Sequence, residues 1–486
     1  MESLKTFKNR KGPRTVIHFM VLYFNNCCIH GFRYLTRAML MFFEKFLWFT
    51  LLVVSIYFCI VVCLSSIDRY YTKSTHIGLE RNYIFWNTTL PSLTVCPMDR
   101  LNISIFAEYC RKNGVKGSQK DILWDFLENL ANSTYINFQN IPESDQIDQV
   151  IKDIGLKAEN YMQLIYNLTY DKTYEPNINE RIRCVDGSTY IHVRQVLTEW
   201  GLCYLGNSML TDQYSSRYFI FGESPKPNKY EQELSLIQCQ VGSFFQRDTQ
   251  FTLRGFSGPA IIAFAHSAFE VSKVDSNSNY AEDGIMYDLS TEEIVAEENL
   301  EHETTIAMRK CRFYHESNLT HYPFYSRNIC QQECRINLAY RICKCIPHFY
   351  PNRIANPKKV CDYKTLRSCF PRHAKFFLKL YEENGNEEKH SGCYCEQNCL
   401  DAVVTIKSID PMANAKHLLQ GIGSQLTVKT WPQTRLKRQV IFSLTDLLVS
   451  IGGTAGLFLG FSVLGFVEVL YFFTIRLIWQ ILGYSL

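Results

Sequence analysis

The stretch IGGTAGLFLGFSVLGFVEVLYFF, from Ile451 to Phe473, decides how this chain is interpreted. It is long enough to cross a bilayer, yet it contains five glycines and one carboxylate, Glu468. Gly452, Gly456 and Gly460 are spaced by four residues, which leaves a flat strip where a second helix backbone can approach closely. A carboxylate at the centre of a span costs about 2.5–3.5 kcal/mol on insertion scales, so it usually faces water or a partner. We therefore interpret the segment as the wall of a pore.

A second apolar run, Phe46–Ile67, contains 22 residues without a charge. At 1.5 Å per residue, this run meets the length needed to span a hydrocarbon core of about 30 Å. The 45 residues before it contain eight Lys/Arg against two Glu, and the run is too long for the core of a cleavable signal peptide. We expect a retained signal anchor with a cytoplasmic N-terminus. The net charge of +4 gives no argument for nucleic acid as a partner.

The segment between the two apolar runs has the features of an oxidising extracellular compartment. It contains 15 of the 19 cysteines and every N-x-S/T sequon of the chain. The candidate glycosylation sites are Asn87, Asn102, Asn132, Asn167 and Asn318. We expect a multi-pass protein of the plasma membrane with both termini in the cytoplasm. Its expected parts are a cytoplasmic arm at 1–45, a first span at 46–67, an extracellular cysteine-rich domain at 68–440, a second span at 441–475 and a cytoplasmic tail at 476–486.

Ten cysteines lie within Cys311–Cys399. Cys330 and Cys334 would share one face of a helix, and Cys393 and Cys395 would share one face of a strand. These spacings favour nested disulfides between early and late cysteines. Zinc is the competing interpretation, but disulfides are much the commoner use of cysteine in a glycosylated extracellular region, and no metal is expected. Because 15 is odd, one thiol of this region is free or pairs between chains.

Four motifs occur in order along the chain. They are HG at His30–Gly31, LPSLTVCP at Leu90–Pro97, CRFYHE at Cys311–Glu316 and DLLVSIGGTAGLFLGFSVLGFVEVLYFFTIR at Asp446–Arg476. Together they resemble the degenerin/epithelial sodium channel superfamily, and the GFS and DLLVS sequences resemble those of its arthropod pickpocket branch. The last motif is highly specific by itself, whereas His-Gly pairs occur everywhere by chance.

The resemblance implies a membrane protein in which two transmembrane helices flank a large, disulfide-rich α+β ectodomain with palm, finger, thumb, knuckle and β-ball. The thumb would lie at about 311–399. A homotrimer, or a heterotrimer with related subunits, would surround one cation pore within the lipid bilayer. The implied activity is conduction of Na⁺, commonly with block by amiloride, and the triggers in the family include acid, peptides, small chemicals, and osmotic or mechanical force. The resemblance implies no enzymatic activity and no cofactor.

The disulfide ladder of the family, carried onto this sequence, implies six pairs. These are Cys96–Cys203, Cys311–Cys399, Cys330–Cys395, Cys334–Cys393, Cys343–Cys369 and Cys345–Cys361. The resemblance leaves Cys110, Cys184 and Cys239 unassigned.

The resemblance also implies a selectivity filter at Gly460–Phe461–Ser462. A break in the helix there would free carbonyl groups that replace the hydration shell of an ion, with the Ser462 hydroxyl as a further candidate oxygen. Phe461 is expected to point away from the ion path into a neighbouring helix. Glu468, about two turns further on, would form a ring of carboxylates that concentrates cations and repels anions.

Four further positions bear on the gate. Asp446 at the outer mouth either concentrates cations or simply marks the water interface. Val449 stands where the family usually has a small residue, which predicts a channel that leaks at rest or needs a partner subunit with a smaller residue. Ser450 stands where many relatives have an acid, so acid gating through that site is in doubt. His30–Gly31 matches the cytoplasmic gating motif, which the resemblance places under the pore.

Three other classes of protein compete with this interpretation. An ectoenzyme would need a catalytic motif, but the GFSGP at Gly255–Pro259 misses the G-x-S-x-G elbow at its last residue. A two-span cell-surface ligand-binding receptor without a pore shares the topology, sequons and cysteines, but it needs neither glycine-rich breaks nor Glu468 within a span. An ATP-gated trimeric channel shares the architecture but differs in its filter and its cysteine pattern.

Overall fold

The structure is a computed structural model, and the chain divides into two units. The residues that it describes are 12–27, 29–37, 39–86, 88–89, 91–169, 182–184, 193–208, 210, 219–220, 240–241, 249–253, 261–274, 279–281, 285–322, 324–350, 357–384, 387–390, 392–411, 424–428 and 432–481. The first unit comprises Met1–Ile77, Glu297–Arg309 and Gln439–Leu486, and the second comprises Gly78–Ala296 and Lys310–Arg438. Asn87 and Cys239 lie outside the described residues, as does the side chain of Cys184.

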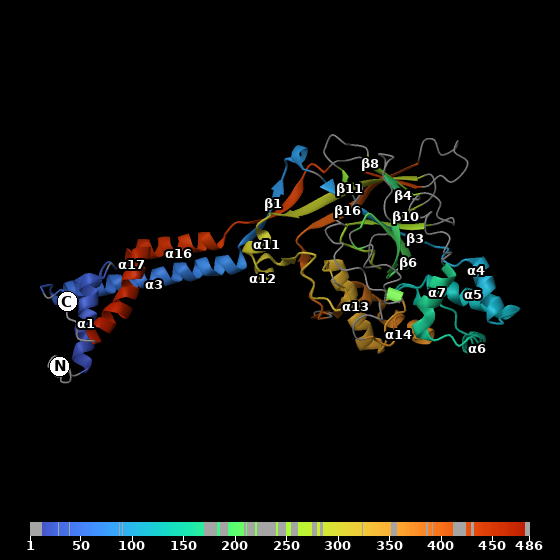
Figure 1. The fold of residues 1–486 in the computed structure, drawn as a ribbon, viewed down its shortest axis with the longest axis horizontal. Helices are drawn as coiled ribbons and strands as arrows, with labels where there is room; N and C mark the ends of the chain where they lie inside the picture. Colours follow the sequence, from blue (N-terminus) through green and yellow to red (C-terminus); the bar gives the residue numbers. More distant parts are fainter. Residues whose placement is uncertain are drawn as a thin grey trace. The chain divides into compact units, whose positions relative to one another are not determined.

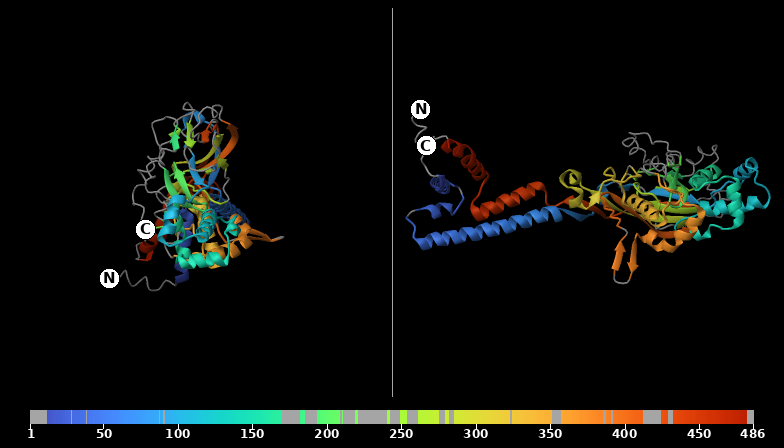
Figure 2. Two further views of the ribbon diagram at one scale, coloured as in Figure 1. Left: turned by 90° about the vertical axis from the view of Figure 1, so that its right-hand side faces the viewer. Right: turned by 90° about the horizontal axis from the view of Figure 1, so that it is seen from below.

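The first unit is helical (Figure 1). Its longest helix, α3 (Phe42–Thr72), contains the apolar run 46–67 and is long and apolar enough to cross a membrane. Helix α16 (Leu444–Leu459) runs beside α3 (Figures 1 and 2). The shorter helices of this unit are α1 (Gly12–Asn26), α2 (Phe32–Thr36), α11 (Leu300–Glu303) and α12 (Ile306–Arg309). Most side chains of α3 are apolar and exposed in the single chain, as lipid contact or a partner chain would require.

The second apolar segment is a broken helix. Helix α16 ends at Leu459, and α17 (Val463–Tyr471) begins after three residues. The axes on the two sides of this break differ by 75°, and the pair is long and apolar enough to count as one broken span. A π-helical turn at Phe472–Arg476 and the short helix α18 (Leu477–Ile481) complete the described chain. The break expected at residues 460–462 is thus present in the helix, and the role of these residues as a filter stays a prediction.

The second unit contains two larger sheets. The seven-stranded sheet has the order β1-β18-β11-β17-β8-β4, and β16 pairs with the second edge of β11. Its strands are β1 (Thr75–Glu80), β18 (Arg435–Val440), β11 (Ile285–Ala296), β17 (Ser424–Val428), β8 (Thr249–Leu253), β4 (Ile182–Cys184) and β16 (Asp401–Pro411). β11 and β16 form the longest ladder, which is antiparallel and has a bulge between Asp288 and Leu289. The strands that lead from and to the helical unit, β1 and β18, are thus neighbours in one sheet.

The second sheet is antiparallel, with the order β10-β9-β3-β6-β5. Its strands are β10 (Asn279–Ala281), β9 (Ile261–His266), β3 (Ser92–Pro97), β6 (Gly201–Gly206) and β5 (Val193–Thr198). Central strand β3 is buried along most of its length, which fits its apolar and small side chains. Three two-stranded ladders accompany these sheets: β12 (Cys311–Arg312) with β15 (Gln397–Asn398), β13 (Tyr381–Asn384) with β14 (Glu387–His390), and β2 (Thr88–Thr89) with β7 (Gln240–Val241).

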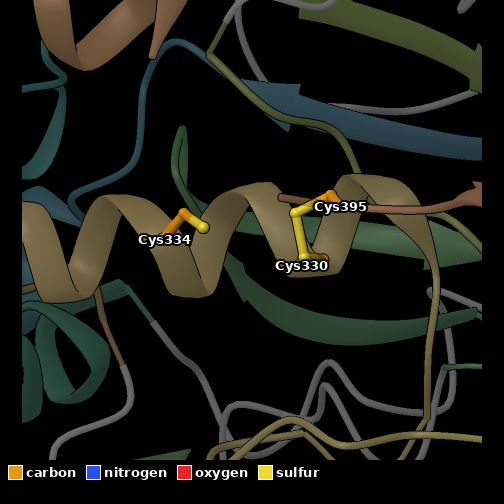
Figure 3. Close-up of side chains that lie close together, drawn as sticks. All are labelled: Cys330, Cys334 and Cys395. Carbon is orange, nitrogen blue, oxygen red and sulfur yellow. A yellow bond between two sulfur atoms is a disulfide. The ribbon is translucent and has the colours of Figure 1, made fainter. Parts of the chain in front are cut away.

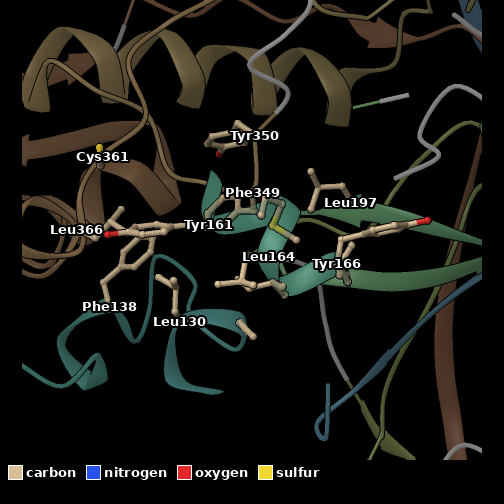
Figure 4. Close-up of a cluster of buried hydrophobic side chains, with 14 of the residues drawn as sticks. Leu130, Phe138, Tyr161, Leu164, Tyr166, Leu197, Phe349, Tyr350, Cys361 and Leu366 are labelled. Atoms are coloured by element: carbon tan, nitrogen blue, oxygen red, sulfur yellow. The ribbon is translucent and has the colours of Figure 1, made fainter. Parts of the chain in front are cut away.

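Helices of the second unit enclose an aromatic core. They are α4 (Ile103–Lys112), α5 (Ser118–Ala131), α6 (Asp145–Asp153), α7 (Tyr161–Thr169), α13 (Arg327–Cys343), α14 (Tyr363–Cys369) and α15 (Ala374–Lys379). Tyr135 is fully buried, and its ring lies 5.2 Å from the ring of Phe377 and 5.7 Å from that of Phe370. Figure 4 shows how Phe138, Tyr161 and other buried side chains gather here. Aromatic pairs at these distances add stability beyond the burial of their area.

The structure contains the six disulfides that the family resemblance implies. They are Cys96–Cys203, Cys311–Cys399, Cys330–Cys395, Cys334–Cys393, Cys343–Cys369 and Cys345–Cys361. Cys330 and Cys334 lie on the same face of α13, and Figure 3 shows the Cys330–Cys395 bond with Cys334 one turn along. Cys110 is a free, buried thiol. These cross-links restrict the unfolded chain and stiffen the part of the unit around α13.

Candidate functional site

The break in the second apolar segment is built around Gly460 and Ser462. Gly460 ends α16 with φ +65°, a left-handed conformation that favours glycine, and its N–H donates to the Gly456 carbonyl at 2.9 Å. A β-carbon at position 460 would also overlap Nδ1 of His30. Ser462 is the N-cap of α17, and its hydroxyl oxygen accepts a hydrogen bond from the Gly465 N–H at 3.2 Å. Gly460 thus caps the end of α16 and Ser462 caps the start of α17, so one helix ends and the next begins within three residues.

The His-Gly pair of the N-terminal arm lies against this break. The N–H of His30 donates to the carbonyl oxygen of Leu459 at 3.0 Å. Gly31 has φ +99°, and a β-carbon there would lie 2.9 Å from Cδ1 of the buried Leu52 on α3. Glycine is therefore the residue that lets the arm pass α3 and reach the end of α16.

Aromatic side chains hold the N-terminal arm against the end of the chain. Phe19 of α1 lies edge to face with Phe473, with 6.1 Å between ring centroids. Tyr23 lies 5.5 Å from Phe472 and 5.0 Å from Phe473. These contacts were not expected from the sequence. The available signal is the four-residue spacing of Phe19 and Tyr23, which places two aromatic rings on one face of a helix.

Helices α3 and α16 make a polar contact in an otherwise apolar interface. The hydroxyl oxygens of Ser66 and Ser450 lie 3.0 Å apart, and Thr454 donates to the Ser450 carbonyl at 2.7 Å. About two turns further along both helices, the rings of Phe58 and Phe458 are stacked with centroids 6.4 Å apart. The sequence analysis names Ser450 but not Ser66. A serine within an apolar span is the signal that would have identified it, because buried hydroxyls seek a partner there.

Asp446 has a defined structural role at the start of α16. Its carboxylate accepts a hydrogen bond from the Ser443 N–H at 2.9 Å, and the Ser443 hydroxyl accepts one from the Asp446 N–H at 3.2 Å. This reciprocal pair is a capping box, which satisfies two main-chain donors of the first turn. Asp446 is also exposed in the single chain, and the choice between its two expected roles stays a prediction.

The chain segments next to the two apolar helices are joined to each other. The N–H groups of Ile441 and Phe442 both donate to the carbonyl of Ser74, which is fully buried. The guanidinium of Arg69, near the end of α3, lies 4.8 Å from the centre of the Phe442 ring. These contacts join the end of α3 to the start of α16.

Several of the residues expected to line the pore face open space in the single chain. The Val449 side chain is 74% exposed, and Glu468 is exposed. Glu468 forms no ion pair with any described residue. A β-carbon at Gly452 or Gly453 would meet no atom of this chain. Phe461 is half-buried and makes no ring contact within the described part, so its expected direction stays a prediction.

The sequons differ in their exposure. Asn102 is exposed and is the N-cap of α4, with Oδ1 accepting from the Ser104 and Ile105 N–H groups at 2.9 and 3.3 Å. Asn167 and Asn318 are also exposed, whereas Asn132 is half-buried.

Comparisons with known proteins find similarity in both units. Residues 23–472 match the family model described as amiloride-sensitive sodium channel. The chain is 27% identical to pickpocket protein 28 of Drosophila melanogaster over 185 residues, which are 35% of this chain but only 30% of that protein. It is 22% identical to pickpocket protein 19 of the same organism over 419 residues, with coverage of 79% and 76%. It is 18% identical to the bile acid-sensitive ion channel of Mus musculus over 477 residues, with coverage of 91% and 85%.

Proposed function

The chain belongs to the amiloride-sensitive sodium channel family, and on that premise we propose that it is a pore-forming subunit of a sodium-selective channel. The helix break at residues 460–462 is the observation that carries this proposal. Irregular backbone within a bilayer persists only where it is buried in protein or faces water. The C-terminal end of α16 also carries the partial negative charge of the helix dipole, which favours cations over anions. Gly460–Phe461–Ser462 is therefore the proposed filter, and Glu468 a second cation-attracting position.

A pore requires more than one copy of these helices. One chain supplies one helix long enough to span and one broken pair, which cannot enclose an ion path. The open faces at Gly452 and Gly453, together with the exposed Val449 and the 81% exposed Leu457, are suited to contacts with other subunits. We assign these faces to a trimer of this chain or of this chain with related subunits. Amiloride block is proposed by analogy with the family description.

The proposed location is the plasma membrane, with both termini in the cytoplasm. The basic arm before α3 favours a cytoplasmic N-terminus, since positive residues are retained on that side. Six disulfides and the exposed sequon residues Asn102 and Asn167 all lie in the second unit, as expected for an extracellular domain. This arrangement places the His30–Gly31 pair on the cytoplasmic side of the filter.

The gate is proposed to involve the contacts between α3, α16 and the arm. An extracellular chemical, osmotic or mechanical stimulus would act through the β1 and β18 strands on the paired ends of α3 and α16. Val449 is bulky at a position where the family usually has a small residue, so a resting leak is the expected consequence. Recordings from cells that express this chain alone measure the leak, and Val449→Gly should reduce it. A silent wild type at the cell surface would contradict constitutive opening.

Electrophysiology tests the proposed function directly. Cells that express the chain, alone or with related subunits, should show a Na⁺ current that amiloride reduces. Ser462→Ala should change the Na⁺/K⁺ permeability ratio, because the filter loses an oxygen and the cap of α17. Ser55→Ala on α3 is the matched control and should leave the ratio unchanged. An unchanged ratio in Ser462→Ala would remove this residue from the filter, and a lack of current under every stimulus despite surface expression would contradict the channel.

A further inference from the structure

The second unit contains a cavity of about 610 Å³ that the proposed pore does not use. This volume lies within the range of about 300–1,000 Å³ that is typical of small-molecule sites. Its walls come from the segment 159–163 at the start of α7, from β5, and from the segment 357–360. The lining residues are Glu159, Asn160, Met162, Gln163, Leu197, Phe219, Ile220, His348, Tyr350, Pro357, Lys358, Lys359 and Val360.

One part of the cavity wall is apolar and buried. Met162, Leu197, Phe219, Ile220 and Val360 are all buried, although they come from segments that are far apart in the sequence. Their side chains form a surface that would favour the hydrocarbon or ring system of a ligand.

The rest of the wall carries an excess of positive charge. Lys358 is half-buried and Lys359 is exposed, and Glu159 is the one carboxylate in the lining. None of these three side chains forms an ion pair with another described residue. Two ammonium groups without an ion pair among the described residues attract a carboxylate or sulfonate, with which they can form charge-assisted hydrogen bonds.

His348 adds a neutral polar group to the same wall. Its Nε2 donates to the Leu130 carbonyl at 3.1 Å, and its Nδ1 is buried without a hydrogen-bond partner in the described structure. Burial lowers the pKa of His348 to about 4, an effect that the Arg100 charge increases and the Leu130 hydrogen bond opposes. At neutral pH the ring therefore contributes no charge, and the lysines determine the sign of the lining.

We propose that this cavity binds a small amphipathic anion. The apolar body of the ligand would lie against Met162, Leu197 and Val360, and its carboxylate or sulfonate would bind Lys358 and Lys359. The proposal of a binding site depends on the cavity alone. Only its consequence for gating rests on the proposed function.

Tyr350 connects the cavity to a buried ion pair. Its hydroxyl donates to Oε1 of Glu199 at 2.5 Å, and the same carboxylate binds Arg335 of α13 at 2.6 and 2.8 Å. Glu199 also accepts from the Val274 N–H at 3.1 Å. The guanidinium and the carboxylate are both fully buried, so a shift of Tyr350 on ligand binding would disturb a network that is expensive to leave unsatisfied. A bound anion that moves Tyr350 would therefore affect Arg335 of α13 through Glu199.

Binding is measured on the purified full-length chain in nanodiscs of zwitterionic lipid by isothermal titration calorimetry. The probe is 4-phenylbutyrate, and its neutral isostere 4-phenylbutanamide reports the contribution of the charge. The variant K358Q/K359Q should bind the carboxylate about tenfold more weakly and the amide unchanged. The variant K152Q/K375Q removes two exposed lysines outside the cavity and should bind both probes like the wild type.

Val360→Phe narrows the cavity and should weaken both probes. Elution volume and the absence of titratable extra thiols show whether each variant is folded. Equal binding of acid and amide, unchanged affinity of folded K358Q/K359Q, or no binding of the carboxylate would each overturn the proposal. A second titration in nanodiscs that contain phosphatidylserine distinguishes a lipid head group from a soluble molecule as the source of the anion. Affinity that is weaker there than in nanodiscs with the same content of phosphatidylglycerol indicates competition by the phosphatidylserine head group, and equal affinity in the two indicates a soluble ligand.

The gating consequence has its own readout. Tyr350→Phe keeps the ring in the cavity wall and removes the hydrogen bond to Glu199, so at saturating probe it should lose the effect of the probe on channel current. Because binding is measured without current, a chain that binds the probe but never conducts would contradict the proposed function and leave the site intact. A chain that conducts but does not bind the probe would overturn the site alone.

Discussion

The main-chain N–H of His30 lies 3.0 Å from the carbonyl oxygen of Leu459 and donates a hydrogen bond to it. This bond satisfies one of the carbonyls that the end of α16 leaves without an intrahelical partner. It also joins the N-terminal arm to the residue that directly precedes the proposed filter. A substitution in either residue pair, His30–Gly31 or Leu459–Gly460, should therefore alter the conformation of both pairs.

Gly460→Ala should disrupt the proposed filter. The left-handed conformation costs an L-residue about 1–2 kcal/mol, and the new methyl group would overlap His30. We expect an altered Na⁺/K⁺ permeability ratio and an altered resting current in whole-cell recordings.

Two further variants distinguish the backbone strain at position 460 from the steric overlap with His30. His30→Ala combined with Gly460→Ala should recover part of the lost function, since the overlap disappears while the strain remains. Gly114→Ala is the matched control, because Gly114 also has a positive φ of +72° and a β-carbon there meets no atom within 4 Å. If the double variant behaves as the sum of the two single variants, the His30–Gly460 contact has no functional weight.

Acidification should destabilise the second unit through two buried histidines. Burial lowers the pKa of His266 to about 4, against the effect of its hydrogen bond to Ser267, and burial likewise lowers that of His348 to about 4. The unfolded chain binds a proton near pH 6.5, whereas the folded chain does so only near pH 4. The stability that each ring contributes is thus complete above pH 6.5 and is lost as the pH falls towards 4. The loss is about 3 kcal/mol per histidine.

Thermal unfolding of the purified chain between pH 7.5 and 4.5 measures this effect. The midpoint should fall less steeply in His266→Asn and His348→Asn than in the wild type. The exposed His76 supplies the control, and His76→Gln should leave the slope unchanged. Identical slopes in all variants would show that other groups dominate the acid response.

Loss of the Cys311–Cys399 cross-link should reduce both stability and surface expression. Removing a native disulfide from an extracellular domain typically costs about 2–5 kcal/mol, and this bridge closes a long loop, with a sequence separation of 88. We expect the double serine variant to be retained inside the cell, as surface biotinylation would report.

Cys110 provides the contrast, because it is buried like a disulfide cysteine but is a free thiol. Cys110→Ala removes only one sulfur and should leave most of the protein at the surface. Equal loss in both variants would attribute the effect to packing and not to the cross-link.

Asn102 should carry a glycan, because its side chain is exposed and its Oδ1, not its Nδ2, caps α4. Ser104→Ala removes the sequon and keeps the cap, so it should increase mobility on a gel by one glycan without loss of stability. Asn102→Gln removes both and should additionally cost about 1 kcal/mol of cap stability. A Ser104→Ala protein that migrates like the wild type before and after glycosidase treatment would show that this site is not used.

The cysteine framework shows how much a local pattern can predict. Cys330 and Cys334 are one turn apart, so α13 presents them on the same side to Cys395 and Cys393. The family resemblance supplied the pairing, and the structure has the same six bridges. The apolar run 46–67 likewise predicts a helix, because length and apolar character are properties of one segment. The break at residues 460–462 was implied only by the family resemblance, since the left-handed geometry at Gly460 depends on what packs against it.

What the sequence by itself determined about this protein is what can be written into consecutive residues: two apolar segments, glycine at the break, the charge of the arm and the cysteine spacing. Only the tertiary structure decided which distant residues meet. It brings His30 to Leu459, Ser66 to Ser450 and Glu199 to Arg335, and it assembles one cavity wall from segments around 160, 197, 220 and 358. The physical reason is that each of these contacts depends on how whole helices and strands pack, and packing leaves no periodic signal in either partner.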